Sequence, residues 1–253
     1  MDKPVNLLWT SGWDSTFRLL SLVLIQQKTV QPFYVKDHQR ASLEMEIKTM
    51  DKIKEMVFKK APGAKNLILP TIYKDRREIK PDEAINAQYK RLLAKNPLGD
   101  QYEWLARYAE QAGIRDLELS IHQDDKARKF VAHYVTGEDA KEDFRLKEEH
   151  LHSDLALFKY FRFPILNLTK LDMEHTAVKH DFLDIMNQTW FCHYPRNGKP
   201  CGLCTPCSAT IEEGLRRRLP LSSQLRYFIH FTVKPPLRKL LKPGKDRLAV
   251  DAK

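Results

Sequence analysis

The chain has 253 residues and a formal net charge of +10 at pH 7, and 42% of its residues are hydrophobic. This size and apolar content allow a sizeable core, as one large domain or two small ones. No signal peptide opens the sequence, and the apolar run at 19–25 is far shorter than the roughly 20 residues that a membrane span requires. We therefore expect a soluble, cytoplasmic protein, with neither a membrane span nor secretion.

Most of the net positive charge lies near the C-terminus. Residues 214–253 contain eleven Lys or Arg and two Asp, which accounts for nine of the ten net charges, and the rest of the chain is close to neutral. We expect one domain over residues 1–225 and a basic tail over 226–253. Such a tail can bind nucleic acid, an acidic protein or an anionic membrane surface, and it can equally be a solvated extension.

In chain order, apolar runs alternate with stretches of helical periodicity. The runs at 6–9, 30–35, 66–72, 117–121 and 163–168 predict strands, and the stretches near 14–27, 41–60, 81–112 and 138–160 predict helices. Pro97-Leu98-Gly99 divides the third of these helices into a helical hairpin, which is a candidate lid or dimer surface. The alternation predicts an α/β fold with a doubly wound parallel sheet and right-handed crossovers.

The first strand is followed by a loop of small and polar residues, TSGWDS at 10–15, and then by a helix. Such a loop aims backbone N–H groups and a helix N-terminus at an anion, typically a phosphate, at the strand ends where ligands of parallel sheets gather. No Walker A pattern is present. A plain strand-to-helix turn with Asp14 or Ser15 as N-cap is the alternative. The candidate phosphate-binding residues are Leu8, Thr10, Ser11, Gly12, Trp13, Asp14, Ser15 and Thr16.

Polar residues also follow three other predicted strands. Gln39 and Arg40 come after the second strand, and Asp124 comes after the fourth in the stretch SIHQDD. We assign these three residues to substrate binding, with helix capping as an equal alternative for Asp124 and its neighbour Asp125. Lys170 follows the fifth predicted strand and is a candidate to neutralise a phosphate or a substrate carboxylate, with an ordinary surface lysine as the alternative.

All four cysteines lie close together near the C-terminus, with the spacing C-x8-C-x2-C-x2-C. In a reducing compartment, clustered cysteines favour metal binding over disulfides. Four thiolates match a closed, tetrahedral Zn²⁺ site, and Gly202 and Pro206 suit the tight turn that this spacing requires. An iron–sulfur cluster and free thiols are the alternatives. The predicted ligands are Cys192, Cys201, Cys204 and Cys207.

Two separate stretches resemble one known family. The TSGWDS loop resembles the S-G-G-x-D-S pyrophosphate loop of the PP-loop ATPases, with Thr10 and Ser11 replacing the Ser and the first Gly. FPILNLTKLDM and TWFCHYPRNGKPCGLCTPC resemble the P-L-x-x-L-x-K, T-W-S-C-Y and C-G-x-C-x-x-C segments of the QueC-like family, the 7-cyano-7-deazaguanine synthases. Lys170, Thr189 and Trp190 fall on matching positions, whereas Phe191 replaces a small Ser. The resemblance covers the loop and residues 163–215.

The resemblance implies a PP-loop fold, often dimeric, and an enzyme of queuosine biosynthesis. In that family ATP adenylates 7-carboxy-7-deazaguanine, releasing pyrophosphate. Ammonia then displaces AMP to give an amide, which loses water to give the nitrile. Mg²⁺ would bridge the phosphates. The implied catalytic residues are Asp14, Ser15 and Lys170, with Asp14 orienting the loop or the Mg²⁺-bound waters.

Three other functions remain open. Relatives of this family in antiphage operons of the CBASS type are implied to join a deazaguanine to a protein amine in place of ammonia, and the basic tail would then bind an acidic protein partner. A tRNA thiolase would use the tail as an RNA arm. A non-catalytic nucleotide-binding module is favoured by Ser11, because its Cβ limits φ where the backbone approaches phosphate closely.

Overall fold

The computed structural model describes residues 3–95, 98–136 and 144–233. The chain divides into two compact units, Met1–Phe191 and Cys192–Lys253, which are described separately below. The boundary that we expected at 225/226 lies inside the helix Leu221–Phe228 of the second unit. Most of the expected basic tail, 234–253, lies outside the described residues. Within the described residues, no helix is long and apolar enough to cross a membrane.

The first unit is built on a five-stranded, all-parallel sheet with the strand order β3-β2-β1-β4-β5. Its register aligns Leu7 with Pro32 on one side of β1 and with Glu118 on the other. Because the chain order reverses on the two sides of β1, the sheet has a switch point between β1 and β4. The strands are β1 (Val5–Leu8), β2 (Val30–Lys36), β3 (Ile72–Asp75), β4 (Leu117–Glu118) and β5 (Phe161–Arg162).

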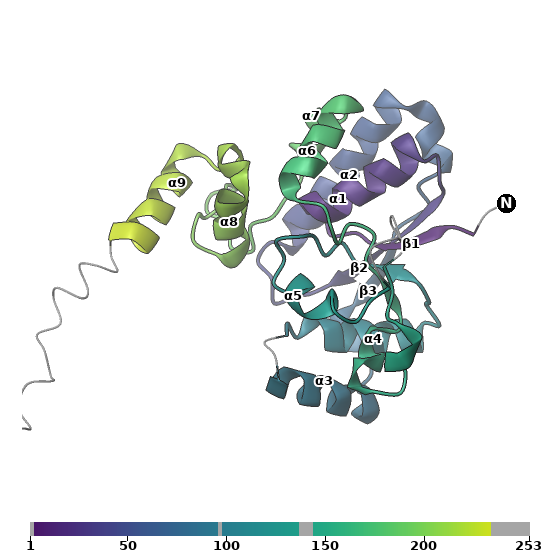
Figure 1. The fold of residues 1–253 in the computed structure, drawn as a ribbon. Coiled ribbons are helices and arrows are strands. Elements are labelled where there is room, and N and C mark those ends of the chain that lie inside the picture. The colour runs from purple at the N-terminus through teal and green to yellow at the C-terminus, as the bar shows by residue number, and fades with distance from the viewer. Residues whose placement is uncertain (1–2, 96–97, 137–143, 234–253) are drawn as a thin grey trace, which may run out of the picture. The chain divides into compact units, whose positions relative to one another are not determined.

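Helices cover both faces of this sheet (Figure 1). One layer contains α1 (Trp13–Leu20), α2 (Leu43–Lys60), α6 (Lys170–Lys179) and α7 (Leu183–Met186). The other contains α3 (Glu83–Lys95), α4 (Gln101–Gln111) and α5 (Arg128–Val131). A π-helical turn, Ser21–Ile25, extends α1, and short 3₁₀ turns cover Pro62–Asn66, Arg76–Glu78, Glu148–His150 and Asp154–Phe158. The parallel α/β class expected from the sequence is therefore confirmed.

The helices form where apolar spacing and end residues favour them. In α2, the buried residues Met50, Ile53 and Val57 recur at helical spacing, with Glu44 in the first turn and Lys60 in the last. These charges complement the helix dipole. Helix α6 begins with a capping box, in which the Thr169 hydroxyl accepts from the Asp172 N–H at 3.1 Å while Asp172 accepts from the Thr169 N–H at 2.9 Å.

Several predicted elements are confirmed and others are wrong. The helical hairpin across 81–112 is present as α3 and α4. The strand expected at 66–72 is shifted to Ile72–Asp75, since 62–66 forms a 3₁₀ turn. The helix expected at 138–160 is wrong for the described part, where Leu146 pairs with Val135 and two 3₁₀ turns follow. The strand expected at 163–168 is also wrong, because β5 ends at Arg162 and buried turn residues follow it.

A buried ion pair connects α1 to the sheet. The Arg18 guanidinium donates two hydrogen bonds of 2.8 Å to the Glu118 carboxylate, and both residues are almost fully buried. Burying such a pair is costly unless its geometry is good, and this bidentate arrangement meets that condition. It fixes the rotation of α1 relative to β4.

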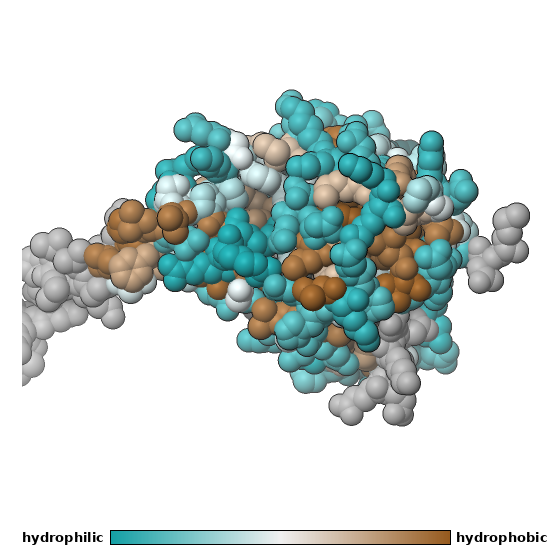
Figure 2. Space-filling model, turned by 90° about the horizontal axis from the view of Figure 1, so that it is seen from above, coloured by the Kyte–Doolittle hydropathy of each residue, from teal (hydrophilic) through white to brown (hydrophobic). Residues whose placement is uncertain are grey.

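The second unit contains the four cysteines and a short helical segment. It comprises α8 (Thr205–Thr210), a kinked turn (Ile211–Leu215), a 3₁₀ turn (Arg216–Arg218), α9 (Leu221–Phe228) and a π-helical turn (Ile229–Val233). Apolar side chains are exposed along α9 and the turn after it (Figure 2). They include Leu221, Leu225, Phe228 and Phe231.

Candidate functional site

The loop Thr10–Ser15, which joins β1 to α1, lies beside the switch point of the sheet. It contributes to a cavity of about 160 Å³, which is closed on the other side by residues that follow β4 and by α4. Crevices at a switch point are the usual ligand sites of open parallel sheets. This volume is below the roughly 300 Å³ of typical small-molecule pockets, so it suits a phosphate-sized part of a ligand. The lining residues include Leu8, Thr10, Gly12, Asp14, Ser15, Ser120 and Asp125.

The loop turns sharply at Ser11, which has a φ of 57°. This left-handed conformation favours glycine, which the resembled loop has at the same position. Ser11 is fully buried, and its Oγ has no hydrogen-bond partner among the described residues. The loop is closed by a hydrogen bond of 3.2 Å from the Thr10 N–H to Ser15 Oγ. The sequence predicts that the Ser11 Cβ limits φ in this loop. The loop nevertheless keeps its sharp turn, and the Ser11 backbone is strained as a result.

The N-terminus of α1 opens toward the loop without a side-chain cap. Gly12 is the N-cap residue, and no side chain caps it within the described chain. The first N–H groups of any helix have no partner inside the helix and carry its positive dipole end. Gly12 and Ser15 line the cavity, so these donors lie beside it. The arrangement can therefore hold an anion.

Thr16 and Trp13 are buried beneath the loop. The Thr16 hydroxyl accepts a hydrogen bond of 3.0 Å from the Trp9 indole, and the Thr16 N–H donates to the Gly12 carbonyl at 3.0 Å. The Thr16 N–H is therefore committed to the first turn of the helix. Trp13 is only 3% exposed. Neither residue is among those that line the cavity.

Three titratable side chains from different elements meet around Asp14, which lines the cavity. Asp14, in the first turn of α1, has its carboxylate 4.0 Å from Lys170 Nζ and 4.0 Å from His122 Nδ1. Lys170 begins α6, and His122 follows β4. Asp14 Oδ1 is buried without a hydrogen-bond partner among the described residues. A carboxylate, Asp14, and a cation, Lys170, therefore lie together at the end of the sheet where the loop is.

The position of Lys170 is not explained by the stability of its helix. It is buried at the first residue of α6, next to the positive end of the helix dipole, where a cation is unfavourable by roughly 0.3–1 kcal/mol. Burial of an ammonium group adds a further desolvation cost. A buried cation at such a place is typical of a functional site.

The second motif of the sequence meets the loop directly. The Trp190 N–H donates a hydrogen bond of 3.0 Å to the Ser11 carbonyl. Thr189 is buried, and its hydroxyl donates to the Met186 carbonyl at 2.7 Å. The loop and the Thr189-Trp190 pair, which lie near opposite ends of the first unit, are thus brought together.

Gln39 and Arg40 lie after β2, within a separate network of charges. The Asp37 carboxylate accepts from the Gln39 N–H at 3.1 Å and from Arg76 at 2.9 Å, and Arg40 lies 3.8 Å from it. Partial burial tends to raise the pKa of Asp37, but hydrogen bonds from Gln39 and Arg76 outweigh it and hold that pKa below its ordinary value. Gln39 and Arg40 do not line the cavity at the switch point.

The residues of the loop after β4 differ in their exposure and in whether they line the cavity. Asp124 is exposed, whereas Asp125 lines the cavity and accepts from the Ala127 N–H at 2.8 Å, as a helix cap does. His122 was given no role from the sequence, although it is buried and lies beside Asp14. Its position directly after an apolar strand is the signal that could have identified it.

The four cysteine sulfurs of the second unit form one cluster. All four lie within 4.8 Å of one another, and the pairs Cys201/Cys207 and Cys192/Cys204 are each 3.9 Å apart. A tetrahedron of sulfurs with metal–sulfur bonds near 2.3 Å has edges of ~3.8 Å. The cluster can therefore hold a metal ion, and its donor set and spacing are compatible with Zn²⁺.

Backbone N–H groups support this cluster. The Cys201 N–H donates to Cys192 Sγ at 3.1 Å, and the Leu203 and Cys204 N–H groups donate to Cys201 Sγ at 3.3 Å. Donors around a sulfur stabilise its thiolate form. The turn requires Gly202, whose φ is +80° and whose Cα faces the Ser223 carbonyl without room for a Cβ.

The thiols influence the protonation of each other. Hydrogen bonding to Cys204 raises the pKa of Cys192 to about 12, and hydrogen bonding to Cys192 lowers the pKa of Cys204. Hydrogen bonding to Cys192 and Cys204 also raises the pKa of Cys207. Adjacent thiolates repel one another, so a cation at their centre is what allows all four to ionise.

The chain matches no protein-family model and no curated protein.

Proposed function

We propose that this chain is an ATP-dependent C–N ligase of the QueC-like type, which adenylates a carboxylate and releases AMP and pyrophosphate. The observation that carries the proposal is the loop Thr10–Ser15 at the switch point, beside the Asp14/Lys170 pair. The hydrogen bond from Trp190 to Ser11 supports it, because it joins the loop to a residue at a matching position of the resemblance. A PP-loop fold is part of the same proposal.

The chemistry explains why such a loop is needed. A carboxylate is a poor electrophile because its leaving group would be oxide. Transfer of AMP from ATP to the carboxylate oxygen releases pyrophosphate and supplies AMP as a leaving group. The uncapped N–H groups at the start of α1 would stabilise negative charge on the departing pyrophosphate, and Lys170 would neutralise phosphate charge.

Asp14 would hold Lys170 in place and accept hydrogen bonds from the waters of a bound Mg²⁺. Mg²⁺ would supply charge neutralisation at the phosphates. Asp14 fits this role because Oδ1 lacks a hydrogen-bond partner among the described residues. Ser15, whose Oγ bonds the Thr10 N–H, would keep the loop closed.

The proposed substrate is 7-carboxy-7-deazaguanine, and the resemblance alone supports this choice. Gln39, Arg40 and Asp124 are its proposed contacts, in regions that lie outside the cavity lining. Ammonia is the nucleophile of the family reaction. A protein amine in an antiphage system is the alternative nucleophile, and the excess of basic residues at 214–253 favours an acidic protein partner in that case.

Incubation with ATP, Mg²⁺ and this acid tests the proposal, with AMP and pyrophosphate measured by chromatography. We expect release of both, stimulated by the acid, and a nitrile by mass spectrometry when ammonia is present. A co-expressed protein that gains an amide-linked deazaguanine would instead identify the conjugating enzyme. ADP and phosphate as products would contradict the adenylation chemistry. Binding of ATP without turnover would favour the non-catalytic module.

We also propose that the four cysteines hold one structural Zn²⁺, which contributes folding energy to the second unit. Metal analysis should find one zinc per chain. Chelation should lower the thermal stability, and added Zn²⁺ should restore it. Iron together with sulfide would contradict the assignment and indicate an iron–sulfur cluster.

A further inference from the structure

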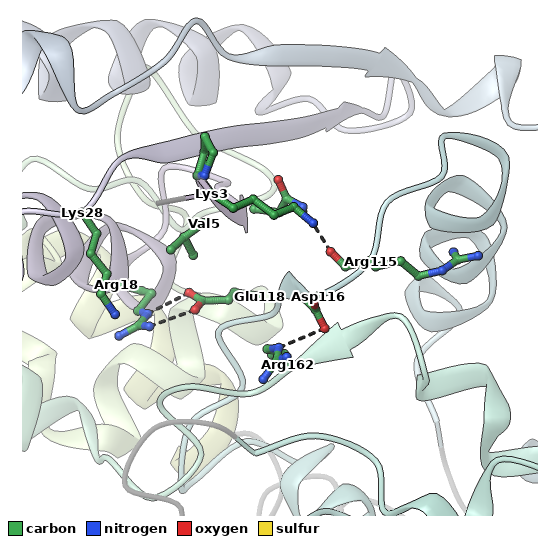
Figure 3. Close-up of a pocket in the computed structure, with 10 residues that line it drawn as sticks. Lys3, Val5, Arg18, Lys28, Arg115, Asp116, Glu118 and Arg162 are labelled. Carbon is green, nitrogen blue, oxygen red and sulfur yellow. Dashed lines mark hydrogen bonds and ion pairs between the residues drawn. The ribbon is translucent and has the colours of Figure 1, made fainter. Parts of the chain in front are cut away.

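A second cavity, of about 330 Å³, lies at the opposite edge of the sheet, where the parallel strands begin (Figure 3). Its lining includes the start of β1, the residues before β2, and side chains of β4 and β5. Because the Thr10–Ser15 loop lies at the other ends of these strands, this cavity is separate from the proposed adenylation site. Its volume lies within the range of roughly 300–1,000 Å³ that small-molecule sites occupy.

The two carboxylates of this cavity are already neutralised. Glu118 accepts two hydrogen bonds of 2.8 Å from Arg18. Asp116 lies 3.0 Å from Arg162 Nε. Figure 3 shows both pairs side by side at the cavity. Each carboxylate therefore has its own guanidinium, and the four charges cancel.

Lysines leave the cavity with an excess of positive charge. Lys3 and Lys28 line it, and neither forms an ion pair with any described carboxylate. Arg115 also lines it, but its guanidinium lies 3.2 Å from Glu110 and points away from Asp116 and Arg162 in Figure 3. The excess of about two positive charges matches the ≈ −1.5 to −2 of a phosphate monoester at pH 7.

The helix dipole does not explain the positions of both lysines, whereas an anionic ligand does. A lysine near a helix C-terminus is stabilised by the dipole alone, and Lys28 follows the turn that ends at Ile25. Lys3, however, lies just before β1 and belongs to no described helix. The two lysines are exposed, come from different segments and line one concave site beside the two neutral ion pairs.

We propose that this cavity binds the phosphate group of a small phosphate monoester, through Lys3 and Lys28, with Arg18 and Arg162 held behind them by their carboxylates. The monoester is preferred to bare phosphate because Pro4 and Val5 add apolar surface to the lining. The site does not depend on the proposed ligase activity.

Titration of the isotope-labelled full chain, followed by amide NMR, tests this site. The probes are inorganic phosphate, AMP as a phosphate monoester, and adenosine as its uncharged counterpart. We expect saturable shifts of the Asn6, Lys28 and Glu118 amides with AMP at up to about 10 mM, a concentration that nearly fills a millimolar site. Tighter binding of AMP supports the monoester, and equal binding of inorganic phosphate makes free phosphate the occupant.

Charge variants make the test specific. Lys28→Gln should weaken AMP binding about tenfold, as loss of a charge-assisted contact does. Lys52→Gln is the matched control, because Lys52 is an exposed lysine of α2 outside the cavity, and it should change binding less than about twofold. The proposal is overturned by shifts confined to the Thr10–Ser15 loop, by equal shifts with adenosine, or by unchanged binding in Lys28→Gln.

Discussion

The Asp14 carboxylate lies 4.0 Å from the Lys170 ammonium, although these residues belong to helices that follow the first and the last strands of the sheet. The pair joins the β1–α1 loop to the start of α6 and places a buried cation beside the N-terminus of α1, which has no side-chain cap.

If this pair serves phosphate chemistry, its two members should be needed for turnover rather than for folding. We expect Asp14→Asn and Lys170→Met each to lower AMP formation at least about 100-fold, in the range that loss of an electrostatic contact to a transition state produces. Asp14→Asn keeps the size of the side chain, so the protein should remain folded, and its thermal midpoint measures the cost of leaving the Lys170 ammonium without its carboxylate. Full activity in either variant would remove the pair from the mechanism.

Ser11 should be a position at which glycine stabilises the protein. Its φ of 57° strains a residue with a Cβ, so Ser11→Gly should raise the free energy of unfolding by about 1 kcal/mol. Ser11→Ala is the control, because it removes the buried hydroxyl but keeps the strain. Urea unfolding of both variants separates the two effects. Equal stability of the glycine and alanine variants would show that the backbone conformation is not strained.

The contributions of Arg18 and Glu118 to the free energy of unfolding should depend strongly on each other. Arg18→Met leaves the Glu118 carboxylate buried without its bidentate partner, which should cost about 3–5 kcal/mol of unfolding free energy. The double variant Arg18→Met/Glu118→Leu removes both charges and should recover most of that loss. A double-mutant cycle by urea unfolding measures the coupling. Additive effects of the two substitutions would contradict a buried, mutually dependent pair.

Gly202 should tolerate alanine far less than Gly198 does. Both glycines have positive φ, so each Gly→Ala variant should lose about 1 kcal/mol from backbone strain. At Gly202 the new Cβ also meets the Ser223 backbone, whereas nothing lies within 4 Å at Gly198. Gly202→Ala should therefore lose bound metal, measured by elemental analysis, while Gly198→Ala retains it. Equal metal content would show that the turn adapts.

Asp37 should contribute stability that depends on pH. Its pKa is below its ordinary value in the folded chain, so its contribution is present at neutral pH and is lost as the pH falls below about 4 through the folded-state pKa. Asp37→Asn should destabilise the protein by up to ~1 kcal/mol at pH 7 and by less at pH 3. Unfolding at both values checks this. The exposed Asp124→Asn is the control substitution, measured at the same two pH values.

The sequence by itself determined the fold class and the cysteine cluster. Alternating apolar runs and helical stretches specify a parallel α/β sheet, and the C-x8-C-x2-C-x2-C spacing brings four sulfurs together through local turns. The sequence also located the loop at 10–15, because its small residues follow a strand directly. These features depend on neighbouring residues, so a local pattern is enough to predict them.

Only the tertiary structure decided which distant residues meet. The strand order places β4 beside β1, and this brings His122 and Lys170 to Asp14 and leaves Gln39, Arg40 and Asp124 outside the cavity. It also pairs Arg18 with Glu118 and gathers Lys3 and Lys28 at the other edge. The strand expected at 163–168 is wrong for the same reason. Its apolar residues lie in buried turns against the core, and an apolar run alone does not distinguish a buried strand from a buried turn.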